Sequence, residues 1–309
     1  MKKSTQLRQL LAKKQLIVAP GCFDALTVLL AQKAGFSAAY LSGYGVSASL
    51  LGMPDMGFTT MTEIHAVARY AANAVGIPVI SDTDTGYGNA INVIRCVREF
   101  IQTGVAGVHL EDQVTPKRCG HVSGKELIPI EEAVGKYRAA AKVRDEYDKD
   151  FVIIARTDAC GALGGGIDEA IKRANAYLEA GADIAFLEAP SSLEEIERIV
   201  EEVKGPLFYN CVGVSPQLSV EKLQELGFAI VIYPSASIEA ACKGVYDLMA
   251  DIKKRGTAAM TDFKDKKQGH PLEDINAFLG FPKVKKWEEE FLPAEQVQKK
   301  YESSTGYEF

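Results

Sequence analysis

The sequence predicts an α/β fold, a (β/α)8 or TIM barrel with a C-terminal helical extension. Eight short apolar segments alternate with helical segments over about 250 residues, the length of a typical barrel of this kind. Polar and charged residues follow six of these apolar segments. The glycine-rich GxGxxG fingerprint, which would favour an open doubly wound sheet, does not occur.

The strands are predicted from short apolar runs that are rich in Val, Ile, Leu or Phe. Such continuous runs are typical of strands that are buried on both faces of a parallel sheet. In chain order they are Ile17–Pro20, Ala38–Ser42, Val79–Asp82, Gly107–Leu110, Phe151–Arg156, Ile184–Glu188, Leu207–Asn210 and Ala229–Tyr233.

Helical segments separate these strands. Several of them end at an Ala-Gly or Leu-Gly pair, such as Ala34-Gly35 and Leu226-Gly227, which is a common C-terminal cap. After a polar amphipathic opening helix, the predicted helices are Asp24–Ala34, Met61–Val75, Ala90–Thr103, Ile130–Tyr147, Asp168–Ala180, Leu193–Val203, Val220–Leu226 and Ile238–Lys254. We therefore place the catalytic barrel in residues 1–255.

Residues 256–309 are predicted to form the helical extension. It contains the apolar segment Leu272–Leu279 together with Phe281, Trp287 and Phe291. Exposing this much apolar surface to water is unfavourable. The extension therefore packs either on its own barrel or on a neighbouring subunit, and we expect the neighbouring subunit.

The composition is that of an ordinary globular protein, with 47% hydrophobic and 25% charged residues among 309. The net charge of −6 and the lack of a long basic block argue against nucleic acid or an anionic membrane as a partner. The first residues lack the apolar run and small-residue cleavage site of a signal peptide, and no apolar run reaches transmembrane length. The six cysteines lack the CxxC spacing of a zinc site. We expect a cytoplasmic protein that acts on a small molecule.

The segment Gly107–Pro129 combines an apolar strand with a dense run of ionisable residues. Cys119 lies between Arg118 and His121, with Lys117 two residues before it. This electropositive setting favours a thiolate, and the flanking glycines allow a mobile loop. The alternative is a solvated loop whose thiol is incidental.

Active sites of (β/α)8 barrels form where the carboxyl ends of the strands meet. The polar endings of six predicted strands therefore come together in space. They are Ser42-Gly43-Tyr44-Gly45, Asp82 to Gly88, His109 to Asp112, Arg156-Thr157-Asp158, Glu188 and Asn210. One such residue alone is more often a helix N-cap, but six together favour an active site.

Asp82, Asp84 and Glu111 form a candidate metal site. Their carboxylates suit a hard cation, either Mg²⁺ or Mn²⁺, and the set lacks the His and Cys ligands that zinc prefers. The alternative is that backbone NH groups satisfy all three carboxylates.

Several groups could bind an acidic substrate. Arg156 can grip a carboxylate through the two hydrogen bonds of its planar fork, and a tight turn at Ser42, Gly43 and Tyr44 offers backbone amides. These groups indicate a 2-hydroxy or 2-oxo acid that binds the metal. With Cys119 as proton donor, the expected reaction breaks or forms a bond to the carbon beside the carboxylate.

Four motifs resemble the isocitrate lyase and phosphoenolpyruvate mutase superfamily, over the length of the predicted barrel. Lys117-Arg118-Cys119-Gly120-His121 is similar to the catalytic loop of its lyase branch, and Asp82-Thr83-Asp84-Thr85-Gly86-Tyr87-Gly88 resembles its metal motif. Ser42-Gly43 resembles its carboxylate-binding turn, and Leu51-Gly52-Met53-Pro54-Asp55 its LGxPD segment.

The resemblance implies a role for each matching residue. Cys119 would be the general acid, and Asp82 would bind Mg²⁺ directly. Asp84 and Glu111 would act on the metal through water. Asp55 would contact the groups around the metal without binding the metal itself.

The resemblance also implies how the substrate is bound and deprotonated. Lys117 and His121 would assist catalysis, and Tyr40 or Tyr44 would help to remove the proton of the 2-hydroxyl near the metal. The expected substrate-binding residues are Ser42, Gly43, Tyr44, His109, Gly120, His121, Arg156, Glu188 and Asn210. A homotetramer that exchanges its terminal helix between paired subunits is implied as well.

The expected function is Mg²⁺-dependent cleavage of a 2-hydroxy di- or tricarboxylate to pyruvate and a carboxylic acid. Cys119 disfavours a phosphonate mutase, and the chain length disfavours isocitrate lyase itself. Asn210 is followed by Cys211-Val212-Gly213-Val214-Ser215, where methylisocitrate lyases usually have a Thr-Glu-Phe-Gly-like turn. This favours a substituted malate, such as 2,3-dimethylmalate, over 2-methylisocitrate.

Four alternatives remain at this point. Two lie in the same superfamily, oxaloacetate acetylhydrolase and oxaloacetate decarboxylase. The third is a non-catalytic barrel that binds a dicarboxylate. The fourth is a hydrolase with Cys119 as the nucleophile, which would need His121 or His109 oriented on the thiol.

Overall fold

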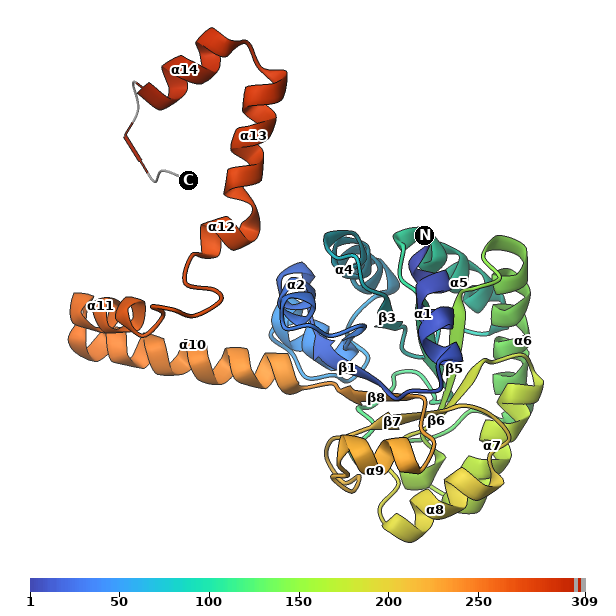
Figure 1. The fold of residues 1–309 in the computed structure, drawn as a ribbon. Helices are drawn as coiled ribbons and strands as arrows, with labels where there is room; N and C mark the ends of the chain where they lie inside the picture. The colour runs from blue at the N-terminus through green and yellow to red at the C-terminus, as the bar shows by residue number, and fades with distance from the viewer. Residues whose placement is uncertain (303–304, 307–309) are drawn as a thin grey trace. The chain divides into compact units, whose positions relative to one another are not determined.

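The computed structural model describes residues 1–302 and 305–306, and it confirms the predicted fold class. Eight parallel strands close a barrel in chain order, and helices surround them (Figure 1). The strands are β1 (Ile17–Cys22), β2 (Ala39–Leu41), β3 (Val79–Asp82), β4 (Gly107–Glu111), β5 (Val152–Thr157), β6 (Ile184–Leu187), β7 (Leu207–Asn210) and β8 (Ile230–Tyr233). Each begins at the predicted residue or next to it.

The barrel closes where β1 pairs with β8, with Ile17 opposite Ile230. Because every pairing is parallel, the carboxyl ends of all eight strands lie at one end of the barrel. Between β4 and β5, the register places Glu111 opposite Arg156. The strand pairing thus places two of the predicted site residues side by side.

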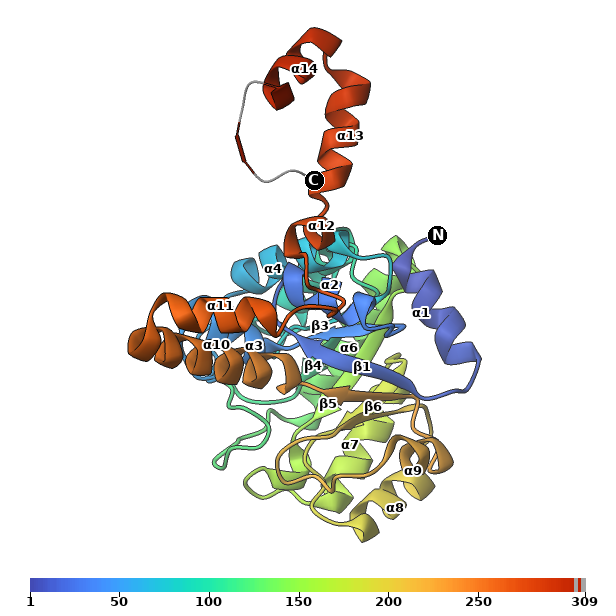
Figure 2. The same cartoon turned by 60° about the vertical axis from the view of Figure 1, so that its left-hand side comes forward.

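The predicted helices of the barrel occur, with ends shifted by one or two residues. Side-chain caps start several of them: Asp24 accepts the Thr27 N–H at 2.7 Å at the start of α2. The helices are α1 (Lys3–Ala12), α2 (Ala25–Lys33), α4 (Met61–Ala74), α5 (Ala90–Thr103), α6 (Ile130–Tyr147), α7 (Ile167–Glu179), α8 (Leu193–Glu202) and α9 (Val220–Glu225). In a second view, the strands again lie inside this ring of helices (Figure 2).

The segment after β2 differs from its prediction as a tight turn. It forms a short helix, α3 (Gly43–Val46), which continues into a π-helical turn, η1 (Ser47–Leu51). Ser42 caps α3, because its Oγ accepts the Gly45 N–H at 3.3 Å. The amides of this segment therefore belong to a helix start, and the Gly43 N–H donates to Asp82 Oδ2 at 3.2 Å.

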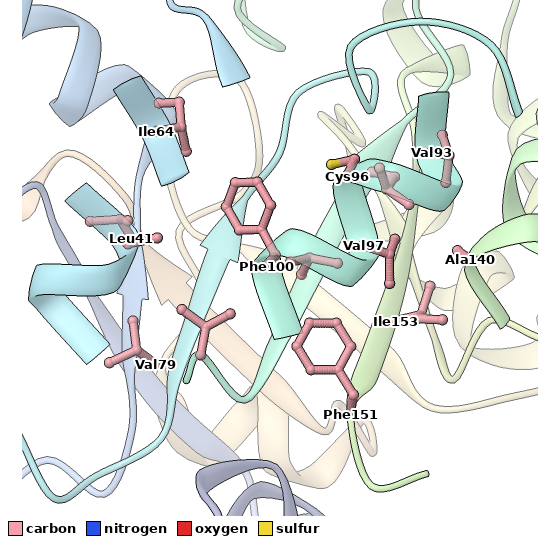
Figure 3. Packing of buried hydrophobic residues seen from close by; sticks show 14 of the residues in the cluster. Leu41, Ile64, Val79, Val93, Cys96, Val97, Phe100, Ala140, Phe151 and Ile153 are labelled. Atoms are coloured by element: carbon pink, nitrogen blue, oxygen red, sulfur yellow. The ribbon is translucent and has the colours of Figure 1, made fainter. Parts of the chain in front are cut away.

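Apolar side chains pack on both faces of the barrel strands. Inside it, side chains such as Ile80, Ile154, Phe186 and Phe208 fill the space between the strands. Outside it, α5 packs residues including Phe100 against the strands, in a cluster shown in Figure 3. These buried layers fix the strand ends that carry the polar residues.

The chain divides into two compact units, the first comprising residues 1–241 and the second beginning at Cys242. Helix α10 (Ala236–Arg255) begins in the first unit and continues into the second. The second unit also contains α11 (Thr257–Asp265), α12 (Ile275–Leu279), α13 (Phe281–Phe291) and α14 (Ala294–Glu302). That residues 256–309 pack on a neighbouring subunit stays a prediction.

In the part of the chain that the structure describes, every helix is too short or too polar to cross a membrane.

Candidate active site

A cavity of about 220 Å³ opens at the carboxyl ends of the strands. The sequence-predicted residues that line it are Tyr40, Ser42, Tyr44, Asp55, Asp82, Cys119, Gly120, His121, Arg156, Glu188 and Asn210. Its other lining residues are Val212, Gly213, Ile232, Pro234, Ser235 and Glu239. The strand endings therefore meet in one place, as the barrel fold predicts.

Cys119 lies in the loop between β4 and α6, which we call the thiol loop (residues 113–127). A bridge between Gln113 and Leu127 closes the base of the loop. The Gln113 side chain accepts the Arg118 N–H at 2.9 Å and donates to the Arg118 carbonyl oxygen at 2.8 Å. The Cys119 N–H donates to the Asp55 carbonyl oxygen at 3.1 Å, so the loop is held beside the cavity.

The prediction of a thiolate at Cys119 is wrong. Burial raises the pKa of the thiol, while the backbone of His121 and the charges of Arg156 and Lys117 lower it by a smaller amount. The ion pairs of Lys117 are with Asp55 and Asp84, not with the thiol. The thiol therefore keeps its proton at neutral pH, as a proton donor must.

Lys117 forms a bridge between two carboxylates. Its Nζ lies 2.6 Å from Asp55 Oδ1 and 2.9 Å from Asp84 Oδ1, and all three side chains are buried. Removing one partner from such a group leaves an uncompensated buried charge. Lys117 thus anchors the thiol loop to the segments that carry Asp55 and Asp84.

Arg156 is the centre of a buried charge network. Its Nε and Nη2 each donate to one oxygen of Asp158 at 2.9 Å, in the bidentate arrangement predicted for a substrate. Its Nε also lies 3.3 Å from Glu111 Oε2, and its Nη1 lies 3.3 Å from Glu188 Oε2. Arg156 still lines the cavity, where a substrate carboxylate would meet it.

Glu188, His121 and Asn210 form one hydrogen-bonded group at the cavity wall. The His121 Nε2 lies 3.1 Å from Glu188 Oε1, and the Asn210 amide donates to Glu188 Oε2 at 3.1 Å. Burial alone would raise the pKa of Glu188, but Arg156, His121 and Asn210 together lower it to about 2. Glu188 is therefore ionised at neutral pH.

His109 does not line the cavity, although it was predicted to bind substrate. It is fully buried in β4, and its Nε2 lies 2.6 Å from the Tyr40 hydroxyl and 3.3 Å from Asp82 Oδ1. This arrangement connects Tyr40, which does line the cavity, to Asp82. A role in holding these two side chains fits the position of His109 better than substrate contact.

The three predicted metal ligands lie together, but they do not form a complete cation site. Among the described residues, no group of three or more His, Cys, Asp or Glu side chains is placed to hold a metal. Asp82 accepts the Gly43 N–H through Oδ2 at 3.2 Å and the Asp84 N–H through Oδ1 at 2.9 Å. Asp84 itself has a left-handed backbone, with φ of 46°, which is strained for a residue with a side chain.

The buried oxygens of this group fit a hard cation. Oε1 of Glu111 is buried and has no hydrogen-bond partner. Burial raises the pKa of Glu111 and of Asp84, because the positive charges around them offset only part of the loss of water. Mg²⁺ needs few direct protein ligands because it keeps several waters, so Asp82 with this unsatisfied group is a suitable donor set.

Gln113, Asp158 and Lys125 belong to the site but were not predicted as functional residues. Each is buried and polar, and each contacts the thiol loop or Arg156. Asp158 was predicted only as one residue of a polar strand ending. Lys125 lies in the run of charged residues after β4, which is a possible sequence signal. The residues that Lys125 contacts, however, depend on the fold.

Comparison with known proteins agrees with this geometry. Residues 7–253 match the family model described as phosphoenolpyruvate phosphomutase. The chain is 49% identical to the 2,3-dimethylmalate lyase of Eubacterium barkeri, with 84% of this chain and 89% of that protein covered. It is 44% identical to the 2-methylisocitrate lyase of Aeropyrum pernix, with 81% and 80% covered.

Solved structures give the same result. The crystal structure of a 2,3-dimethylmalate lyase has a TM-score of 0.88, 34% identity and 99% coverage of both chains. That of a phosphonopyruvate hydrolase with oxalate and Mg²⁺ has a TM-score of 0.84, 32% identity, and 95% and 100% coverage. The chain belongs to the phosphoenolpyruvate mutase/isocitrate lyase superfamily. Within it, the chain is a carbon–carbon lyase.

Proposed function

We propose that this lyase cleaves a 2-methyl-substituted malate, such as 2,3-dimethylmalate, to pyruvate and a carboxylic acid. One observation carries the proposal: Cys119, Asp82 and Arg156 line the same cavity. They supply a proton donor, a metal ligand and a carboxylate-binding group. The relatives named 2,3-dimethylmalate lyase and 2-methylisocitrate lyase support this reaction class.

In the proposed reaction the 2-hydroxyl loses its proton and the C2–C3 bond breaks. C2 becomes the carbonyl carbon of pyruvate, and the electron pair of the bond passes to C3 and the carboxylate beside it. The Cys119 thiol then donates its proton to C3, which gives the second product. The raised pKa of the thiol supports this role, because it keeps the proton on sulfur until C3 needs it.

Tyr40 is the better placed of the two tyrosines to handle the proton of the 2-hydroxyl. It is buried, lines the cavity and contacts His109, whereas Tyr44 is 43% exposed. Burial raises the pKa of Tyr40 well above its ordinary value, so a free tyrosinate is unfavourable. We propose that Tyr40 passes the proton through its hydrogen bond with His109.

Asp82 would hold Mg²⁺ directly, and Asp84 and Glu111 would act through water; Mn²⁺ has the same ligand preferences. The phosphonopyruvate hydrolase complex with Mg²⁺ supports this choice. A bound Mg²⁺ would supply the positive charge that stabilises negative charge developing on substrate oxygens.

The cavity wall supports a dicarboxylate with apolar substituents over a tricarboxylate. Val212, Ile232 and Pro234 give part of the wall an apolar surface. Arg156 is the one Lys or Arg side chain among the lining residues, and Glu239 adds a negative charge. With the metal and Arg156 each binding one carboxylate, a third would lack a cationic partner.

Pyruvate release, coupled to lactate dehydrogenase, tests the proposal. We expect EDTA-sensitive release from 2,3-dimethylmalate with Mg²⁺, at a kcat/KM at least about tenfold above that for 2-methylisocitrate, since an unpaired carboxylate is costly to bury. A faster reaction with 2-methylisocitrate would contradict the proposal that the cavity wall favours a dicarboxylate over a tricarboxylate. Release of acetate and oxalate from oxaloacetate, with no pyruvate from either lyase substrate, would identify the acetylhydrolase instead.

The cysteine-hydrolase alternative is disfavoured by the hydrogen bonds of both histidines. Both ring nitrogens of His121 face groups other than the thiol, since Nε2 contacts Glu188 and Asn210 and Nδ1 accepts the Val214 N–H at 3.4 Å. The Nε2 of His109 contacts the Tyr40 hydroxyl. Their positions therefore support roles other than activating the Cys119 thiol as a nucleophile.

We propose that the protein is a cytoplasmic homotetramer joined through residues 256–309. Large apolar side chains in this segment support the proposal, since Leu279 is 52%, Trp287 47% and Phe291 70% exposed in the single chain. Light scattering of the full chain is expected to give four chain masses, and removal of residues 256–309 to give a smaller assembly. If the truncated chain still forms an assembly of four chains, this role of residues 256–309 is contradicted.

A further inference from the structure

We propose that Lys125 is a positioning residue that holds the thiol loop against the Arg156–Asp158 pair. This proposal rests on the proposed function in one respect, namely that the thiol loop carries the proton donor. Lys125 is only 2% exposed, and a buried ammonium is unfavourable unless it is paired. Its Nζ donates to the Gly120 carbonyl oxygen and lies 3.8 Å from Asp158 Oδ1.

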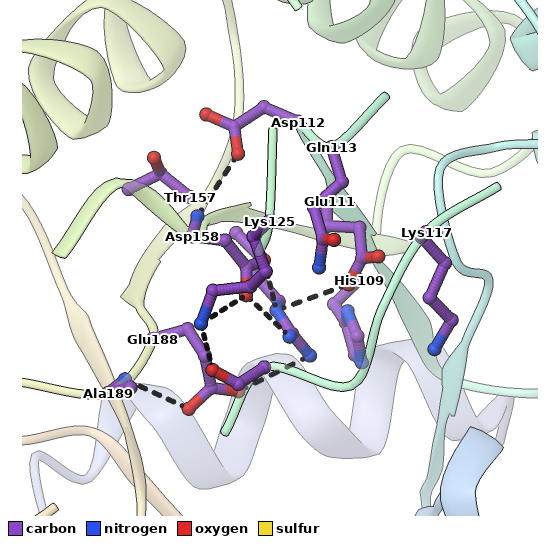
Figure 4. Close-up of polar contacts among 12 residues, drawn as sticks. His109, Glu111, Asp112, Gln113, Lys117, Lys125, Thr157, Asp158, Glu188 and Ala189 are labelled. Carbon is purple, nitrogen blue, oxygen red and sulfur yellow. Dashed lines mark hydrogen bonds and ion pairs between the residues drawn. The ribbon is translucent and has the colours of Figure 1, made fainter. Parts of the chain in front are cut away.

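The two lysines of the thiol loop end at different parts of the site. Figure 4 shows Lys117 apart from Lys125, which lies beside Asp158 and Glu188. Lys117 binds Asp55 and Asp84, whose segments precede the loop in the sequence. Lys125 therefore provides a separate attachment, to the end of β5.

The attachment is made at Gly120, where the backbone of the loop lies against the charge network. A Cβ atom on Gly120 would lie 2.5 Å from Arg156 Nη2 and 2.5 Å from Glu188 Cγ, so the backbone itself contacts these side chains. Lys125 donates its hydrogen bond to the carbonyl oxygen of the same Gly120. The bond therefore holds Gly120, which lies between Cys119 and His121, in place.

The other end of the attachment is firmly held. The Asp158 N–H donates to Asp112 Oδ1 at 3.0 Å, and Asp112 Oδ2 accepts the Tyr177 hydroxyl at 2.7 Å and Arg173 at 3.2 Å. All of these side chains are buried. Lys125 therefore joins the loop to a rigid part of the barrel.

The test replaces Lys125 with Met, which keeps the length of the side chain and removes its charge and donors. We expect Cys119 to react with iodoacetamide about tenfold faster, because the loop opens more often without this charged hydrogen bond. Peptide-resolved mass spectrometry separates Cys119 from the exposed Cys242. We also expect kcat to fall by about tenfold or more with a smaller change in KM, because the proton donor is misplaced.

Two variants serve as comparisons. Lys172→Met alters an exposed lysine on α7 and should leave both measurements unchanged. Lys125→Gln keeps a donor for the Gly120 carbonyl oxygen without the charge, so both its alkylation rate and its kcat should lie between those of the unmodified chain and of Lys125→Met. If Lys125→Met does not fold, the same measurements on Lys125→Gln decide the matter, with a rise of about threefold in alkylation expected.

Alkylation of Cys119 within twofold of the unmodified chain in every folded Lys125 variant would overturn the proposal. The alkylation readout needs no substrate, so it is independent of the proposed reaction. Faster alkylation without any pyruvate release from the unmodified chain would leave the role of Lys125 intact and reject the proposed function.

Discussion

Replacement of Cys119 by serine is expected to lower kcat by about three orders of magnitude while the fold stays intact. A serine hydroxyl has nearly the same size, but it is a far weaker acid than a thiol, so protonation of C3 becomes slow. Coupled pyruvate release and the thermal unfolding midpoint measure the two effects. Cys242→Ser, at an exposed cysteine of the second unit, provides the matched control and should retain full activity.

The pH dependence provides a second check on the same residue. A general acid must be protonated, so activity is lost as the pH rises through the pKa of the thiol. Because burial raises that pKa, the alkaline fall in kcat/KM should lie above the ordinary cysteine range. An alkaline limb that is identical in the residual activity of Cys119→Ser would assign it to another group.

Replacement of Arg156 by methionine is expected to lower the free energy of unfolding by about 3–5 kcal/mol, since it leaves buried carboxylates without their partner. Asp158, Glu111 and Glu188 all face this guanidinium. Denaturant unfolding measures the loss. Arg198→Met, at a surface ion pair with Asp168, is the control and should unfold like the unmodified chain.

Arg156→Lys separates stability from function. It keeps one positive charge but loses the planar fork that binds Asp158 through two hydrogen bonds. We expect a smaller loss of stability than for methionine and a fall in kcat/KM of about 100-fold. Unchanged kcat/KM in Arg156→Lys would show that the fork is not needed to align the substrate.

The sequence was sufficient for the barrel because each strand is a local apolar run, and local patterns need no knowledge of the fold. Asp82 and Cys119 could be found for a similar reason, since one lies in a short motif at the end of β3 and the other in a short motif of the loop after β4. The protonation state of the Cys119 thiol could not be predicted in this way. The nearest basic residues in the sequence suggested a thiolate, but burial raises the pKa of the thiol by more than the charges of Arg156 and Lys117 lower it.

Residues that act through distant partners were the hardest to predict. Lys125 and Asp158 are 33 positions apart in the sequence, and only the barrel brings them together. His109 differs from these residues in its depth in the barrel. Its side chain lies on the same face of β4 as Glu111 but farther from the carboxyl end of the strand, where it contacts Tyr40 and does not line the cavity.

The apolar part of the cavity wall and Cys119 lie on different segments of the chain. Val212 and Gly213 follow β7, whereas Cys119 belongs to the loop after β4. Under the proposed function, the residues that contact the substituents of the substrate can therefore change while those that take part in the reaction are kept. Relatives with two different substrates in their names, at 49% and 44% identity to this chain, are consistent with such a history. Under the proposed function, a new substrate requires changes after β7 and around β8, while Cys119, Asp82 and Arg156 stay the same.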